Sequence, residues 1–320
     1  HTRCLHSVYK AYSLMTQYEL TFNPVVKAAL EAGKSVVALE STVITHGLPY
    51  PQNVQTAVLM ETAVHEGGAL PATIGIIGGE IIVGLSEEQM DYLGQLAGGD
   101  SVRKCSRRDL PLVMAAGDDG STTVAGTMII AHLAGIDVFA TGGIGGVHRG
   151  HPFDVSADLM ELGRTPVTVV CSGAKSILDL PATLEVLETQ GVTILGYGTD
   201  ELPAFYARSS GLPIDQRVES PQEVADIIQA RRALNYDSGM LVTAPAPEAE
   251  AMPFDEAEAA IVQATREADE QGIHGPVSTP WLFRRIVELT DGRSMKANVA
   301  LLRNNGYVAA QIATAVAASR

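Results

Sequence analysis

Short apolar runs alternate with helix-like stretches along most of the chain, and this alternation restricts the possible folds more than any other feature of the sequence. Several runs are apolar at nearly every position, as expected for strands buried on both faces of a sheet that is covered by helices. The strand-like runs are 35–42, 72–85, 137–143, 167–173, 192–198 and 238–245. Helical patterns separate them at 52–68, 122–134, 155–162, 181–189 and 221–234. The sequence therefore predicts an α/β fold.

The rest of the chain gives the expected domain organisation. Residues 1–22 are expected to form an N-terminal arm, with an organelle-targeting segment as an open alternative because the first 18 residues are basic. A further apolar run, 110–116, continues the alternation, and 120–136 is expected to contain a buried helix because it is too short and too mixed to cross a membrane. The segment 245–254 is short enough to be one loop, and helices are expected at 255–271, 279–289 and 294–320. We therefore expect one domain over 23–320, with a helical C-terminal region.

Charge and cysteine usage exclude several classes of protein. Lys and Arg number 22 against 37 Asp and Glu, a formal charge of −15, so a nucleic acid polymer would be repelled. A small anionic substrate remains compatible with this charge, because a pocket needs only two or three placed donors. The 3 cysteines lie far apart without a CxxC pair, which argues against a disulfide framework or a structural zinc site and favours a reducing, cytoplasmic location.

Two glycine-rich turns do not match known nucleotide-binding motifs. In 141–150, His148 stands where a dinucleotide-binding G-x-G-x-x-G motif needs its third glycine, and 171–176 lacks the glycines of a phosphate-binding Walker A loop. Such turns still provide free backbone N–H groups, and simple turn formation is the plainer explanation.

A lysine and a glutamate follow two of the apolar strands. Lys175 comes just after 167–173, where ligands bind in α/β sheets, and a partly desolvated amine there could form a Schiff base with a sugar aldehyde. A surface lysine at a helix start is the alternative. Glu40 ends the first strand and could hold a proton near neutral pH, or be a paired structural acid.

Two further groups could bind ions. Asp154 and Asp158 are four residues apart on a predicted helix, so their carboxylates would share one face and suit Mg²⁺ or Mn²⁺. Alternatively, Asp154 caps the helix and Asp158 is solvated. Lys104, Arg107 and Arg108 form the densest positive cluster and could clamp a phosphate monoester, or form a solvated turn with Asp109 as counterion.

Together, these segments resemble the pseudouridine-5′-phosphate glycosidase family, which is related to the indigoidine-synthesis A proteins. The resemblance covers about residues 23–320 and is carried in order by 38–53 (ALESTVITHGLPYPQN), 104–111 (KCSRRDLP), 122–150, 153–162 (FDVSADLMEL), 167–192, 251–254 and 278–283 (STPWLF). It implies a three-layer α/β/α fold with a largely parallel or mixed central sheet, and assembly as a homotrimer. It also implies reversible cleavage of the C–C glycosidic bond of pseudouridine 5′-phosphate to uracil and ribose 5-phosphate with a divalent metal, typically Mn²⁺.

The resemblance also implies roles for individual residues. Lys175 would be the Schiff-base nucleophile and Glu40 the proton donor that helps to open the ribose. Asp154 would bind the metal, and Asp158 would act through metal-bound water. The remaining expected substrate contacts are Lys104, Val124, His148, Ser156, Ala157, Asp158 and Asn298.

Two other functions stay open on the sequence alone. A class I aldolase-like lyase acting on another sugar phosphate would use the same lysine, and only a requirement for the uracil ring would separate the two enzymes. A non-catalytic metabolite-binding relative is the third alternative, which the presence of both Lys175 and Glu40 disfavours.

Overall fold

The computed structural model describes residues 19–273 and 278–319, and its centre is a mixed sheet. The expected N-terminal arm lies largely outside these residues. Seven neighbouring strands, in the order β3-β2-β7-β10-β14-β12-β13, are parallel, while β4 and β6 pair antiparallel with β3. The strands of this sheet are β1 (Thr21–Phe22), β2 (Val36–Leu39), β3 (Leu70–Ile77), β4 (Glu80–Val83), β5 (Val102–Cys105), β6 (Asp119–Thr122), β7 (Val138–Ala140), β10 (Thr168–Cys171), β12 (Thr193–Tyr197), β13 (Gln216–Val218) and β14 (Met240–Thr243).

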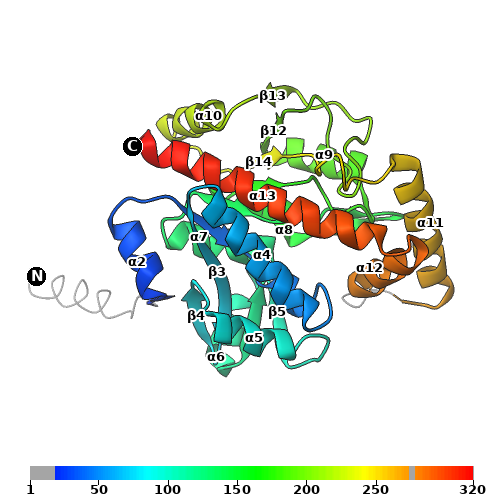
Figure 1. Cartoon of the computed structure of the whole chain (residues 1–320), viewed down its shortest axis with the longest axis horizontal. Helices are drawn as coiled ribbons and strands as arrows, with labels where there is room; N and C mark the ends of the chain where they lie inside the picture. Colours follow the sequence, from blue (N-terminus) through cyan, green and yellow to red (C-terminus); the bar gives the residue numbers. More distant parts are fainter. Residues whose placement is uncertain (1–18, 274–277, 320) are drawn as a thin grey trace, which may run out of the picture.

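Helices cover both faces of the sheet, which confirms the three-layer α/β/α expectation (Figure 1). Helices α4 and α13 contact each other and strands on one face, with α10 against α13. Helix α7 lies on the opposite face with α8 beside it, and α9 lies against α8. The helices are α2 (Pro24–Glu31), α3 (Thr42–Thr45), α4 (Gln52–Glu66), α5 (Glu87–Gln95), α6 (Leu110–Ala116), α7 (Val124–Leu133), α8 (Ala157–Leu162), α9 (Leu180–Thr189), α10 (Pro221–Ala233), α11 (Phe254–Glu270), α12 (Ser278–Leu289) and α13 (Arg293–Ala318).

The central strands are buried along their whole length, as their apolar sequences predict. All four residues of β2, β10 and β14 are buried, because helices exclude water from both faces of the sheet. The same core cluster continues into α11, α12 and α13. No helix among the described residues is long and apolar enough to cross a membrane.

Three segments differ in detail from the sequence prediction. The run 72–85 is not one strand but the antiparallel pair β3–β4, because Gly78 and Gly79 adopt positive φ and reverse the chain. The run 110–116 is a helix, α6, which carries a proline in its first turn. The region 120–136 contains the strand β6 as well as the expected buried helix α7.

A small antiparallel sheet lies apart from the main one. It consists of β11 (Leu178–Asp179), β8 (Val147–His148) and β9 (His151–Val155), in that order. All five residues of β9 are exposed, and Phe153 is 99% exposed. This hairpin holds residues that the sequence assigned to the start of a helix, a difference that bears on the predicted metal site.

Candidate active site

A cavity of about 480 Å³ opens at the carboxyl ends of the parallel strands. Its lining includes residues that follow β2 and β7 directly, Lys175 on the loop after β10, and residues of α12 and α13. Strand β3 lies on one side of β2 and β7 on the other, so the cavity is at a point where the direction of sheet growth changes. Such switch points are the usual place for ligands in α/β sheets.

Glu40 is the buried acid of this cavity. It follows β2 directly, and its two carboxylate oxygens accept hydrogen bonds from the hydroxyls of Thr42 and Thr141. Burial raises the pKa of the Glu40 carboxyl above its usual range, while the nearby charge of Lys175 and the Thr141 hydroxyl act in the opposite direction. The site therefore holds a carboxyl group that keeps its proton to higher pH than an exposed glutamate does.

Lys175 lies on the loop that follows β10, within electrostatic range of Glu40. Its backbone N–H donates to the carbonyl of Ile144 at 3.0 Å, and its own carbonyl accepts from the N–H of Leu178 at 3.0 Å. The side chain is half-buried and lines the cavity. The amine and the acid that the sequence placed at the ends of two different strands therefore share one site.

Two glycines allow the loops after β7 and β10 to approach each other beneath this cavity. Gly173 has φ of +84°, and a Cβ atom there would lie 2.4 Å from the carbonyl oxygen of Pro203. A Cβ atom on Gly143 would lie 2.8 Å from the ring of Phe205 and 3.0 Å from the carbonyl oxygen of Gly173. A side chain at either position would displace the loop that carries Lys175.

Only one member of the predicted cationic cluster, Lys104, lines the cavity. The Lys104 side chain is exposed to the open cavity. The surrounding protein still removes part of the water around its ammonium group, which lowers the pKa of Lys104, and the charge of Lys175 lowers that pKa further. Arg107 instead forms an ion pair with the buried carboxylate of Glu161 at 2.6 Å, and Arg108 is 92% exposed. Of the three cations that could together bind a phosphate, Lys104 alone lines the cavity.

The prediction that Asp154 and Asp158 share one face of a helix was wrong. Asp154 lies in the exposed strand β9, whereas Asp158 lies in the first turn of α8, whose cap is Ser156. Proline at 152 and the pairing of β9 with β8 extend the chain there, so the helix starts only at Ala157.

The donor set fits a divalent ion only in part. Both oxygens of the buried Asp158 carboxylate accept backbone N–H groups, from Ala125 at 2.9 Å and from Gly145 at 2.8 Å. Asp154 is exposed, and one carboxylate suits an ion that keeps most of its waters. Within the described part of the chain, no three His, Cys, Asp or Glu side chains are grouped to hold a metal ion.

The other expected substrate contacts divide between the cavity and its surroundings. Asn298, on α13, lines the cavity, and Asp158 lies near enough to affect the pKa values of Glu40 and Lys104. Val124 begins α7 and is buried beside the Ala125–Asp158 contact. The cavity lining does not include the remaining ones, which are His148 in β8, Ser156 at the cap of α8 and the exposed Ala157.

His46 is a cavity residue that sequence reasoning missed. It follows the short helix α3, and its Nδ1 atom lies 2.6 Å from the hydroxyl of Thr45 and 3.2 Å from that of Ser121. Burial, and then the charge of Lys104, lower the pKa of His46 to about 4, so it is neutral at physiological pH. Its place only six residues after Glu40, in a turn that leaves the same strand, was the available signal.

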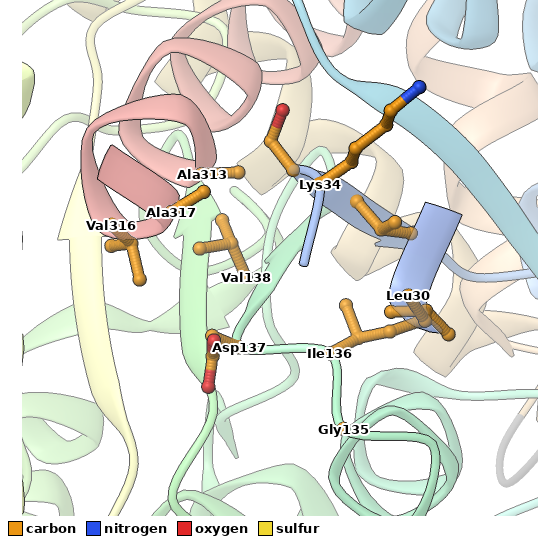
Figure 2. Close-up of a pocket in the computed structure, with 11 residues that line it drawn as sticks. Leu30, Lys34, Gly135, Ile136, Asp137, Val138, Ala313, Val316 and Ala317 are labelled. Atoms are coloured by element: carbon orange, nitrogen blue, oxygen red, sulfur yellow. The ribbon is translucent and has the colours of Figure 1, made fainter. Parts of the chain in front are cut away.

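A small crevice lies at the opposite, amino ends of the strands (Figure 2). It is bounded by Leu30 of α2, by residues that lead into β2 and β7, and by the end of α13. Its volume of about 20 Å³ is too small for a sugar phosphate. The chemistry-bearing side chains therefore belong to the cavity at the carboxyl ends.

Comparison with known proteins gives long matches. The family model described as indigoidine synthase A like protein matches residues 25–315. The pseudouridine-5′-phosphate glycosidase of Escherichia coli (strain K12) is 54% identical over 296 residues, which is 92% of this chain and 94% of that protein. The protein of the same name from Methylobacterium nodulans is 52% identical over 303 residues, covering 94% of this chain and 89% of that protein.

Two solved structures share the fold. The prealnumycin C-glycosynthase AlnA, in complex with ribulose 5-phosphate, has a TM-score of 0.85 and 39% identity, and the match covers 94% of this chain and 97% of that chain. An indigoidine synthase A-like protein from Thermotoga maritima has a TM-score of 0.84 and 36% identity, with 93% and 97% covered.

Proposed function

The chain belongs to the indigoidine synthase A-like family, and we propose that it is the enzyme that reversibly cleaves the C–C glycosidic bond of pseudouridine 5′-phosphate to uracil and ribose 5-phosphate. The observation that carries this proposal is the pairing of Lys175 with the buried, pKa-raised Glu40 in one cavity. Relatives named for this activity match nearly the whole chain.

The chemistry of a C-glycoside explains why this pair suits the reaction. The uracil carbon has no lone pair that an acid could protonate, so the usual oxocarbenium route of glycosidases is poorly suited. In the proposed cleavage, the neutral amine of Lys175 bonds to C1′ and displaces the ring oxygen, which takes its proton from Glu40. The C1′-bound nitrogen then returns one proton to the Glu40 carboxylate, and uracil leaves with the electrons of the C1′–C5 bond and takes that proton at C5. The remaining C1′=N imine is hydrolysed by water to ribose 5-phosphate.

The other cavity residues would hold the substrate. Lys104 offers a cation to the phosphate or the base, and Asn298 offers an amide from α13. A divalent ion such as Mn²⁺ would be held by Asp154 with waters in its other positions, and would supply positive charge beside the site when bound. His148 remains a proposed phosphate or base contact that the cavity lining does not support.

Three wider properties are part of the proposal. A homotrimer would cover apolar surface such as Phe153 of the exposed strand β9, which light scattering on the purified protein would test. A cytoplasmic location agrees with two buried free cysteines. A catabolic direction is favoured where free uracil and ribose 5-phosphate are scarce.

The experiment that tests the reaction is an incubation with pseudouridine 5′-phosphate after chelation, with and without added Mn²⁺. Equal amounts of uracil and ribose 5-phosphate are expected, and borohydride should trap a ribose 5-phosphate adduct on Lys175. The variant Lys175→Ala should lose both results, while Lys34→Ala, altered at the small crevice of the opposite end, should keep them. A folded enzyme that binds the nucleotide and releases no uracil would contradict the proposal.

A lyase acting on another sugar phosphate is the second candidate, because the structural relative AlnA was solved with ribulose 5-phosphate. It would also form the borohydride adduct. Turnover of a sugar phosphate without a uracil ring, at a rate that equals or exceeds that of pseudouridine 5′-phosphate, would favour this candidate.

A further inference from the structure

Arg149 binds the loop that carries Lys175 from outside the active cavity. It lies between β8 and β9, and its Nε atom donates to the carbonyl of Leu178 at 3.0 Å while Nη2 donates to the carbonyl of Ser176 at 3.0 Å. Ser176 follows Lys175 by one residue and Leu178 follows it by three. Arg149 does not line the cavity with Lys175 but a separate one of about 490 Å³, which Ser176 and Leu178 also line. It therefore touches the loop and not the expected substrate position.

The far side of the same guanidinium is fixed to α11. Nη1 and Nη2 donate to the two carboxylate oxygens of Glu258 at 2.5 and 3.0 Å. The side chains of the pair are 28% and 32% exposed, so water screens it only in part. The planar fork of Arg149 thus joins a helix to two backbone carbonyls of the Lys175 loop, a geometry that a lysine cannot reproduce because it offers one nitrogen.

Main-chain bonds and core packing also hold this loop. The N–H groups of Ile144 and Phe205 donate to the carbonyls of Gly173 and Ser172, both at 3.1 Å, and the side chains of Ile177 and Leu178 are buried in the core. Arg149 adds side-chain bonds to the carbonyls of Ser176 and Leu178, where the chain enters the two-residue pairing of β11 with β8. Because β8 leads directly to Arg149, the arginine lies where it can lock both strands of that pairing. Removing it would loosen the backbone from which the Lys175 amine projects.

We propose that Arg149, held by Glu258, is a positioning residue that fixes the Lys175 amine for attack on C1′. The proposal rests on the function proposed above for Lys175. Displacement of a reacting group by about 1 Å costs roughly 100-fold in rate even when the altered residue is remote from the chemistry. The loss should fall on imine formation, because substrate binding uses residues on other elements.

The matched control is a second arginine–glutamate pair on the same helix. The Nε and Nη2 atoms of Arg285 donate to the two carboxylate oxygens of Glu267 on α11, at 2.5 and 3.1 Å. The side chains of Arg285 and Glu267 are 30% and 21% exposed. Arg285 also binds Glu288, and neither contact reaches the Lys175 loop. Arg149→Met therefore removes an ion pair together with the contacts to the Lys175 loop, whereas Arg285→Met removes a similar ion pair and leaves those contacts in place.

Steady-state kinetics and borohydride trapping with ribose 5-phosphate test the proposal. We expect Arg149→Met to lower kcat and the trapping rate by about 10- to 100-fold with KM changed less than about 3-fold. Arg149→Lys should recover part of the rate, and Glu258→Gln should lose less than Arg149→Met because both carbonyl contacts remain. Equal rates for Arg149→Met and Arg285→Met, or a loss confined to KM, would overturn the proposal.

Amide hydrogen exchange separates this proposal from the proposed function. The Leu178 amide, which donates to the Lys175 carbonyl, should exchange faster in Arg149→Met than in Arg285→Met. If the wild-type protein forms no adduct, the proposed function fails, while faster exchange would still support the restraint of the loop by Arg149. Unchanged exchange would overturn that restraint, whatever the activity.

Discussion

Removing one hydroxyl from Glu40 should move the pH dependence of the reaction by a predictable amount. Thr141→Val keeps the shape of a side chain that is 2% exposed but removes its hydrogen bond to the carboxylate. That bond lowers the pKa of Glu40, so its loss raises the pKa further. A hydrogen bond to a charged group contributes about 1.5–3 kcal/mol, which corresponds to a shift of roughly 1–2 pH units.

The assay is kcat/KM for pseudouridine 5′-phosphate measured across pH. If Glu40 acts in its protonated form, activity falls as it loses its proton, so the limb that belongs to Glu40 moves to higher pH in Thr141→Val. Thr141→Ser keeps the hydroxyl and should leave that limb in place. A limb that shifts equally in both variants, or in neither, would refute the view that the Thr141 hydroxyl sets the proton affinity of Glu40.

Three further changes have expected outcomes. Asp154→Ala should raise the Mn²⁺ concentration needed for half-maximal activity, which a metal titration measures. Asp158→Ala should leave that concentration unchanged and lower the midpoint of thermal unfolding, because the buried N–H of Ala125 and the partly buried N–H of Gly145 lose their acceptor. The pKa of His46 is 6.5 in the unfolded state and about 4 in the folded state, so the free energy of unfolding should fall as pH drops through this window, by roughly 3 kcal/mol in full. Urea unfolding at several pH values should show a smaller fall in His46→Gln than in the wild-type protein. Gly173→Ala should prevent folding or abolish adduct formation, since its Cβ atom would meet the Pro203 carbonyl at φ of +84°; soluble yield and trapping are the measurements.

The α/β architecture was predictable because buried parallel strands have a distinctive composition. Strands such as β2 and β10 are apolar throughout, and residues just after them face the ligand-binding end of the sheet. This rule alone brings Glu40 and Lys175 to one edge. It does not show that α13 returns more than a hundred residues later to place Asn298 in the same cavity, since helix periodicity identifies a buried face but not the neighbour that covers it.

Short and exposed elements were not predictable in the same way. Strand β8 has two residues, and every residue of β9 is exposed, so neither has the alternation of apolar and polar residues that marks a half-buried strand. The spacing of Asp154 and Asp158 therefore suggested a helix face that does not exist. Likewise, one hydroxyl partner of Glu40 is local, from Thr42 at the start of α3, but the other comes from Thr141, 101 residues after Glu40, which the pairing of β2 with β7 brings beside it.

The electrostatic coupling of Glu40 and Lys175 bears on how one cavity can supply both an acid and an amine. The charge of Lys175 lowers the pKa of Glu40, so a Lys175 that has lost its proton no longer opposes the effect of burial. In the proposed mechanism, the acid would then hold its proton more tightly when the amine attacks. Because burial is the largest influence on the pKa of Glu40, the cavity favours the protonated form of this carboxyl group more than water would. Hydroxyl partners such as Thr42 and Thr141 suit the proposed role of Glu40, since an arginine in their place would hold Glu40 ionised and remove the proton that the proposed ring opening uses.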